Sequence, residues 1–269
     1  MKIFAVANQK GGVGKTSVAV NLSATLAHYG QRSLLIDLDP QGNATTGSGI
    51  DKNSVAKTLY GVLLGEYSVA EARVRAPGHY DVLPANRELA GAEIEMINID
   101  QREFRLKQAL AAVTPDYDFV VIDCPPALNM LTVNALTAAD SVIIPMQCEY
   151  YALEGLSDLV GTLRKVKANL NPKIEIEALV RTMYDPRSSL TNQVSDEIKN
   201  HFGDKVFDTV IPRNIRIAEA PSYGKPVILY DPASKGAIAH MAFARELLGR
   251  QGIEIKEPVE LNDNVEAAA

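Results

Sequence analysis

Residues 7–17, A-N-Q-K-G-G-V-G-K-T-S, decide the fold of this chain. They follow an apolar run at residues 3–7 that predicts a buried strand. They precede residues 18–28, where apolar side chains recur every four positions as in a helix. A strand, a glycine-rich turn and a helix start in this order are typical of a phosphate-binding loop. The helix start offers unpaired N–H groups and the positive end of its dipole, and glycines let the backbone curl around a phosphate.

Two side chains of this loop predict nucleotide chemistry. Lys15 would supply charge to the β- and γ-phosphates, and the Thr16 hydroxyl would ligate Mg²⁺. The standard pattern G-x-x-x-x-G-K-[ST] requires a glycine at position 9, where this chain has Gln9 followed by Lys10. The alternative is an ordinary glycine turn with a solvated lysine, but the order of strand, glycines, Lys-Thr and helix favours the phosphate loop.

The string K-G-G-V-G-K-T resembles the deviant Walker A motif of the ParA/MinD ATPases, and N-Q-K-G-G-V-G-K-T resembles the ParA/Soj partition branch. The resemblance implies that Lys10 reaches across a homodimer interface to the partner's nucleotide. It also implies a nucleotide-binding loop made of Lys10, Gly11, Gly12, Val13, Gly14, Lys15, Thr16 and Ser17.

Two further apolar strands end in acidic residues. Residues 33–39 end in D-L-D before a polar loop at 40–49, and residues 117–123 end in Asp123. Open α/β sheets place ligand chemistry at such strand ends. The motif D-x-D-P-Q-G-N resembles the family's switch I, in which Asp39 would position the attacking water and Asp37 would be a helper; the alternative is that both acids cap the turn.

Asp123 has the position of a Walker B aspartate. We predict a metal site formed by Thr16, Asp39 and Asp123, with the two carboxylates acting through water. Cys124, beside the strand, is interpreted as a small buried hydrophobe.

The resemblance extends to the segment I-P-R-N, where Pro212 and Asn214 are expected to contact adenine. The chain has no guanine-reading N/T-K-x-D motif. We therefore expect ATP/ADP and Mg²⁺ as cofactors, with Lys10, Lys15 and Asp39 as the catalytic residues of an in-line hydrolysis.

Composition limits the class of protein. The 269 residues carry a net charge of −6, with 12 Lys and Arg against 16 Asp and Glu in residues 1–150, and 14 against 12 in residues 151–250. A local basic face on the second part is therefore compatible with an acidic chain. Two cysteines provide no disulfide framework, no apolar run spans a bilayer, and no signal peptide precedes the first strand. These features predict a cytoplasmic protein.

Strand and helix patterns alternate along the chain, which predicts one doubly wound α/β domain with a mostly parallel sheet flanked by helices. Further strands are expected at 80–83, 140–146, 174–181 and 206–211, and helices at 55–63, 102–113, 149–170, 193–202 and 236–248. The apolar residues 96–99 are either core or a partner surface. We expect an ATPase domain over residues 1–251 and a disordered acidic, alanine-rich tail at 252–269.

The family resemblance further implies ATP-dependent dimers that bind DNA without sequence preference, associate with the nucleoid and are released by a ParB-type centromere-binding partner. The contexts M-Y-D-P-R and P-R-N-I-R assign DNA contacts to Arg187 and Arg216, with Lys225 and Lys235 as additions or as plain solvated charges.

Three rival functions belong to related classes. A ParA-like ATPase could position another cargo, such as a chemotaxis cluster or polysaccharide machinery. A MinD-like membrane ATPase would need a basic amphipathic C-terminal helix, and the acidic tail lacks one, so we expect no membrane contact. An iron–sulfur reductase of the nitrogenase iron-protein type would need cysteines in glycine-rich settings, which Cys124 and Cys148 lack.

Overall fold

The computed structural model of the protein describes residues 1–255. The described chain forms an eight-stranded sheet with the order β3-β4-β2-β5-β1-β6-β7-β8. The strands are β1 (Lys2–Val6), β2 (Ser33–Asp37), β3 (Val74–Ala76), β4 (Tyr80–Leu83), β5 (Phe119–Asp123), β6 (Ser141–Gln147), β7 (Glu175–Tyr184) and β8 (Val206–Pro212). Every neighbouring pair is parallel except β3 and β4. The predicted doubly wound, mostly parallel α/β fold is confirmed.

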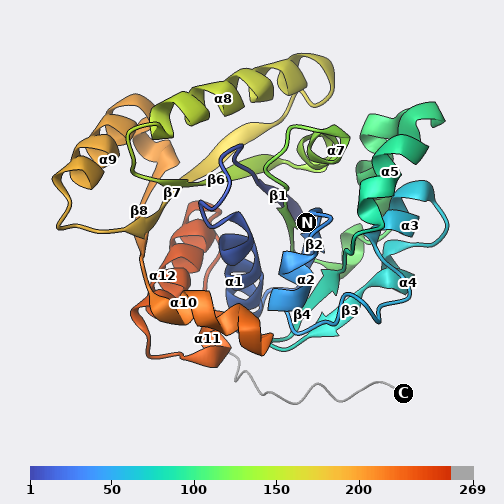
Figure 1. Ribbon diagram of the computed structural model, residues 1–269, viewed down its shortest axis with the longest axis horizontal. Helices are drawn as coiled ribbons and strands as arrows, with labels where there is room; N and C mark the ends of the chain where they lie inside the picture. Colours follow the sequence, from blue (N-terminus) through green and yellow to red (C-terminus); the bar gives the residue numbers. More distant parts are fainter. Residues whose placement is uncertain (256–269) are drawn as a thin grey trace.

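Helices cover both faces of the sheet (Figure 1). The α-helices are α1 (Lys15–His28), α2 (Asn43–Gly47), α3 (Leu59–Leu64), α4 (Val69–Ala72), α5 (Leu89–Glu95), α6 (Arg105–Ala111), α7 (Met130–Ala138), α8 (Ala152–Asn169), α9 (Ser189–Phe202), α10 (Ile215–Glu219), α11 (Val227–Tyr230) and α12 (Lys235–Arg250). Short 3₁₀ turns are η1 (Met96–Asn98), η2 (Arg102–Phe104), η3 (Thr114–Asp116), η4 (Gly203–Lys205) and η5 (Ala220–Tyr223). No helix within residues 1–255 combines the length and the apolar character needed to cross a bilayer.

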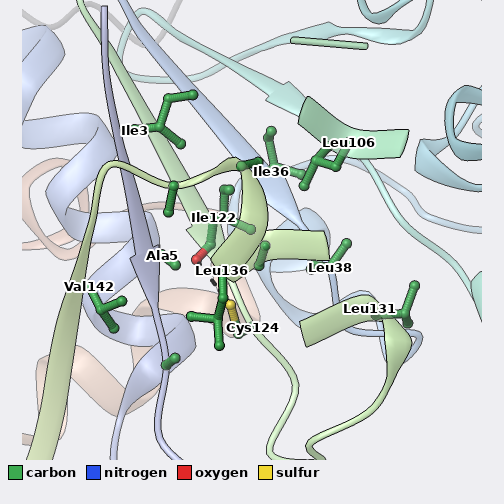
Figure 2. Packing of buried hydrophobic residues seen from close by; sticks show 14 of the residues in the cluster. Ile3, Ala5, Ile36, Leu38, Leu106, Ile122, Cys124, Leu131, Leu136 and Val142 are labelled. Atoms are coloured by element: carbon green, nitrogen blue, oxygen red, sulfur yellow. Dashed lines mark hydrogen bonds between the residues drawn. The ribbon is translucent and has the colours of Figure 1, made fainter. Parts of the chain in front are cut away.

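The core divides into two layers because the central strands are buried on both faces. One layer packs residues such as Ile36, Ile122 and Leu136, which Figure 2 shows close together, and α5 to α8 contribute to it. The other layer holds α1 and α12 against the opposite face. Cys124 is buried in the first layer, which confirms its interpretation as a small hydrophobe.

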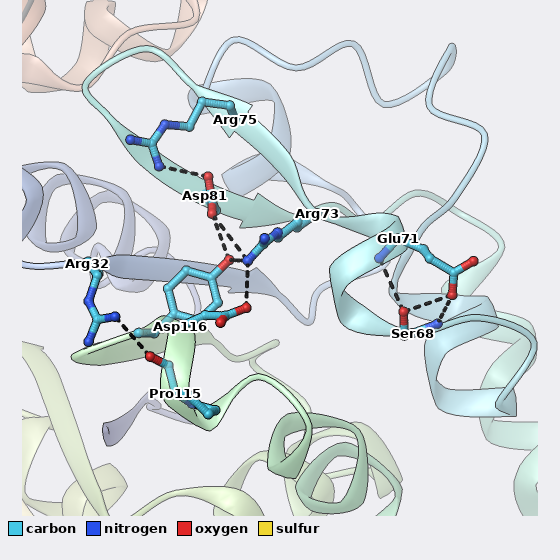
Figure 3. A network of polar contacts seen from close by, with 9 residues as sticks. Arg32, Ser68, Glu71, Arg73, Arg75, Asp81, Pro115 and Asp116 are labelled. Atoms are coloured by element: carbon cyan, nitrogen blue, oxygen red, sulfur yellow. Dashed lines mark hydrogen bonds and ion pairs between the residues drawn. The ribbon is translucent and has the colours of Figure 1, made fainter. Parts of the chain in front are cut away.

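Polar contacts attach the β3–β4 hairpin to the amino end of β5. Arg75 donates to Asp81 at 2.9 Å, and the Tyr117 hydroxyl donates to the other Asp81 oxygen at 2.7 Å. Arg73 contacts Tyr117 and Asp116, so both strands of the hairpin are tied to the chain entering β5 (Figure 3). The sequence did not reveal β3, which is only three residues long.

Several predicted boundaries were wrong. The polar loop predicted at 40–49 contains α2, because Asp37 caps this helix, and β2 ends at Asp37, two residues before the predicted end. Strand β7 extends to Tyr184, three residues past the predicted end at 181, and α9 starts at Ser189, four residues before the predicted start. The segment 96–99 divides, since Met96 is fully buried and Ile97 is 56% exposed. Of the predicted tail, residues 256–269 lie outside the described residues.

Candidate nucleotide site

The loop between β1 and α1 has the backbone shape of an anion cradle. Gly12 and Gly14 adopt left-handed φ angles of 74° and 89°, a conformation that residues with a Cβ rarely adopt. Helix α1 begins at Lys15 directly after Gly14, which has no side chain to cap it. The first-turn N–H groups of α1 therefore point out of the helix without intrahelical acceptors, where they can donate to phosphate oxygens.

Lys15 lies inside this loop and is only 7% exposed. Its ammonium donates to the carbonyl of Lys10 at 3.1 Å. Burial lowers the pKa of Lys15, and the nearby carboxylates of Asp123 and Asp39 act in the opposite direction. Lys15 is thus a desolvated cation aimed into the cradle.

Asp123 is the buried acid of the site. It ends β5 with no exposed surface, and neither carboxylate oxygen has a hydrogen-bond partner in the part of the chain that the structure describes. Burial, and then the proximity of Asp37, raise the pKa of Asp123 well above its ordinary value. The Thr16 hydroxyl lies close enough to counteract this rise, but the contact lacks hydrogen-bond geometry. A buried carboxylate without a partner is costly, so the site favours a cation.

The oxygen donors of Thr16, Asp123 and Asp39 suit Mg²⁺, which prefers hard oxygen ligands and keeps several of its waters. No group of three His, Cys, Asp or Glu residues within 1–255 could hold a metal by itself. A cation at this site would therefore need phosphate oxygens as well, and the P-loop holds phosphate beside it.

The two acids after β2 have different surroundings. Asp37 is fully buried and accepts hydrogen bonds of 2.7 Å from both the amide and the hydroxyl of Thr45. Burial raises its pKa to about 6, against the effect of these hydrogen bonds. Asp37 thus holds the first turn of α2 through Thr45, in line with the turn-capping alternative, which was predicted for both acids. Asp39 is half-buried, accepts from the Gln41 amide at 2.9 Å and lies near Lys15.

A pocket of about 550 Å³ opens beside the cradle. Gly14, Thr16 and Ser17 line one end, and Pro212 and Asn214 line another part, so the two residues expected at the base share a cavity with the phosphate loop. The Asn214 side-chain oxygen is already used, because it accepts from the Arg216 amide at 2.9 Å and caps α10.

Sequence reasoning missed three residues that build this pocket. The Thr182 hydroxyl donates to the Val13 carbonyl at 2.7 Å and fastens β7 to the P-loop. Met183, also in the lining, has a φ of 49°. Asn21 links Ser17 to the amide of Val227. The signal for Asn21 is a polar residue on an otherwise apolar helix face, whereas nothing in the sequence marks Thr182 or Met183.

The Lys10 side chain forms an ion pair outside the loop sequence. Its ammonium lies 2.6 Å from a carboxylate oxygen of Glu149, just before α8. Tyr150 and Tyr151, which follow Glu149 in the sequence, are 75% and 67% exposed.

The predicted DNA residues come from four separate segments of the chain. Arg187 is in the β7–α9 loop, Arg216 is on α10, and Lys235 is the exposed first residue of α12. Lys225 lines the pocket together with Pro212 and Asn214, nearer to the predicted base than the other three.

Comparisons with known proteins agree on one family. A family profile described as an AAA domain matches residues 1–176. The chain is 52% identical over 255 residues to the chromosome partitioning protein ParA of Caulobacter vibrioides, covering 93% of this chain and 95% of that protein. It is 54% identical over 247 residues to the sporulation initiation inhibitor protein Soj of Bacillus subtilis, covering 91% and 98%.

A solved structure has the same architecture. The cobyrinic acid a,c-diamide synthase of Mycobacterium smegmatis, with bound ADP and magnesium, matches with a TM-score of 0.83 and 38% identity. The match covers 93% of this chain and 95% of that one.

Proposed function

This chain belongs to the ParA/Soj family of chromosome-partitioning ATPases, and we propose that it hydrolyses ATP with Mg²⁺ to segregate chromosome or plasmid DNA. The observation that carries the proposal is Asp123, a fully buried carboxylate without a hydrogen-bond partner among the described residues, beside Thr16 and Lys15. The ADP and magnesium bound to the related Mycobacterium smegmatis protein support the same cofactors here.

The phosphates would lie on the first turn of α1, with Lys15 against the β- and γ-oxygens. Thr16 would hold Mg²⁺ directly, and Asp123 and Asp39 would hold its waters. The bound ion would neutralise charge that develops on the phosphates. The base would enter the 550 Å³ pocket beside Pro212 and Asn214. The proposed ATPase domain is residues 1–251.

Asp39 would orient the attacking water, since it is half-buried and lies near Lys15. The reaction is an in-line attack on the γ-phosphate that requires positioning and charge neutralisation but no covalent intermediate. Lys10 would serve the partner subunit's nucleotide in an ATP-dependent homodimer. Its ammonium is paired with Glu149 in the single subunit, and dimerisation would move it from Glu149 to the phosphates of the partner.

The ATP-bound dimer would bind DNA without sequence preference through Arg187 and Arg216, with Lys225 and Lys235 nearby. A ParB-type centromere-binding partner would stimulate hydrolysis and release the DNA. The relatives named as partitioning proteins support this assignment. The protein would then work in the cytoplasm, on the nucleoid. A related ATPase that positions another cargo remains the alternative, and a ParB-type gene beside this one would favour partition.

The test compares Asp123→Asn with Asp118→Asn. Asp118 lies just before the same strand, at its opposite end, and binds Arg32 on the surface. We expect Asp123→Asn to lower Mg²⁺-dependent ATP hydrolysis by about 10- to 100-fold, as loss of an outer metal ligand does elsewhere. Asp118→Asn should hydrolyse ATP at the wild-type rate. Equal rates for Asp123→Asn and wild type would refute the proposed metal site.

A further inference from the structure

Strands β7 and β8 bring the two arginines proposed for DNA to one surface. Tyr184 pairs with Pro212 in the sheet, so the loop carrying Arg187 runs beside the segment that leads into Arg216. We define the β7–β8 surface by its charged residues, Asp185, Arg187, Arg213, Arg216, Glu219 and Asp231. The three arginines and three carboxylates balance in charge; Lys225 and Lys235, proposed nearby, are not among these six residues.

Asp185 holds the Arg187 guanidinium at two points. Arg187 Nε and Nη2 donate to the two carboxylate oxygens at 2.9 and 2.8 Å. The Arg187 amide donates to the same carboxylate at 3.1 Å. The backbone therefore helps to fix the position of the Asp185 carboxylate. These contacts lower the pKa of Asp185 to about 2, and Arg213 contributes to the shift. The arginine side chain is 88% exposed, and Asp185 occupies two of its five N–H donors.

Arg216 is held by two acids. Its Nη1 lies 2.9 Å from Glu219, one turn along α10, and its Nε lies 3.1 Å from Asp231 at the end of α11. Two negative charges therefore lie within ion-pair distance of the Arg216 guanidinium and would repel a phosphate that approaches it. A phosphate that binds the same donors of either arginine competes with these acids, and their negative charge weakens the electrostatic attraction on which non-specific binding depends.

We propose that Asp185, Glu219 and Asp231 compete with DNA phosphates for Arg187 and Arg216, and so keep the DNA affinity of a single subunit low. This inference rests on the proposed DNA-binding function. In a dimer, two such surfaces can bind the same DNA molecule. Once the first surface is bound, the second binds at a high effective concentration, which a single subunit lacks. The acids thereby make DNA binding depend on the ATP-bound dimer, because a subunit with unopposed arginines would bind DNA without a partner.

The experiment measures the affinity of the full-length protein for a fluorescent DNA duplex of random sequence, by anisotropy, with ATP, with ADP and without nucleotide. The variant is Asp185→Asn with Asp231→Asn; asparagine at 185 keeps the oxygen that accepts the Arg187 amide. The matched control is Asp116→Asn with Asp118→Asn, which likewise removes two negative charges; Asp116 binds Arg73. Asp118 also binds an arginine at two points, at 2.7 and 3.1 Å, and accepts its amide, but it lies at the other end of the sheet.

We expect the double variant to bind DNA about tenfold more tightly than wild type without nucleotide or with ADP. Removing one negative charge near a phosphate raises the affinity severalfold even in water. The dependence of log affinity on log salt should steepen by about one. Basal ATP hydrolysis without DNA should be unchanged, which shows that the variant is folded.

Three results would overturn the inference. An equal gain in the Asp116→Asn and Asp118→Asn control would mean that only net charge matters. An unchanged affinity in the double variant, while Arg187→Glu with Arg216→Glu abolishes binding of the ATP form, would reject the competition and leave the proposed function intact. If neither wild type with ATP nor the double variant binds DNA, both the inference and the proposed DNA-binding function fail.

Discussion

His240 is a titratable side chain that lies in the core instead of the site. It is fully buried in α12, and neither ring nitrogen has a hydrogen-bond partner among residues 1–255. Burial lowers its pKa to about 3, so the folded protein keeps the ring neutral at pH values where an unfolded chain protonates it. A histidine with a depressed pKa is a source of acid instability, because protons bind preferentially to the unfolded state.

Replacing His240 should therefore flatten the pH dependence of stability. Between pH 7 and pH 5 the wild type should lose about 2 kcal/mol of unfolding free energy more than His240→Leu, because the unfolded histidine titrates near pH 6.5 and the folded one near 3. Urea denaturation at both pH values measures the difference. His201→Gln, on the exposed side of α9, is the control and should follow the wild type. Parallel pH dependence of wild type and His240→Leu would contradict the assignment.

At the scale of elements, α2 shows why part of the fold could not be predicted. Its sequence, N-A-T-T-G, is polar and lies between glycines, which indicates a loop. The helix forms because the buried Asp37 carboxylate, distant by eight residues, accepts from Thr45, whose hydroxyl in turn accepts from the Ala85 amide at 2.9 Å. The helix propensity of residues 43–47 does not reflect these tertiary contacts, so it could not predict the helix.

Thr45→Val should consequently destabilise the protein by about 2–4 kcal/mol, since it removes a hydroxyl that satisfies two buried groups, Asp37 and the Ala85 amide. Thr46→Val is the matched control. The Thr46 hydroxyl bonds only the Gly42 carbonyl one turn back, so this change should cost less than about 1 kcal/mol. Chemical denaturation at neutral pH compares the two, and similar losses would show that the Asp37 contact adds nothing.

The junction of α10 and α12 depends on a glycine. A Cβ at Gly236 would lie 2.5 Å from Ile217 Cγ1 and 3.1 Å from the Asn214 oxygen that caps α10. At Gly249 in the same helix, a Cβ would meet none of the described residues within 4 Å. An alanine at position 236 would therefore combine a steric conflict with a gain in helix propensity, whereas an alanine at position 249 would only raise the helix propensity.

Gly236→Ala should lower stability by about 1–3 kcal/mol through overpacking, whereas Gly249→Ala should raise it by up to about 1 kcal/mol through helix propensity. Thermal denaturation gives the sign of each change. Because the conflict displaces α10, Gly236→Ala should also weaken DNA binding by the ATP form. A stabilised Gly236→Ala protein with normal DNA binding would contradict the packing described at this junction.

For the whole molecule, the sequence predicted the sheet, the phosphate loop and the acidic strand ends, because buried parallel strands and glycine turns leave local patterns. Within residues 54–113 the sequence predicted the structure only in part. The short helices there depend on distant contacts such as Arg105 with the Leu63 carbonyl and Asn134 with the Leu106 amide. The pocket wall at Thr182 and Met183 was missed for the same reason. The Lys10–Glu149 pair joins residues 139 positions apart and could not be predicted from either segment.

The central claim is that two subunits share each ATP site, with Asp39 acting in its own subunit and Lys10 in the partner. Lys10→Ala and Asp39→Ala should each be inactive alone. When they are mixed, a mixed dimer has one site that combines the Asp39 of one subunit with the Lys10 of the other. Half of the dimers are mixed and each has one intact site, so we expect about a quarter of wild-type ATP hydrolysis. A mixture as inactive as either variant alone, although sedimentation shows that mixed dimers form with ATP, would contradict the shared site.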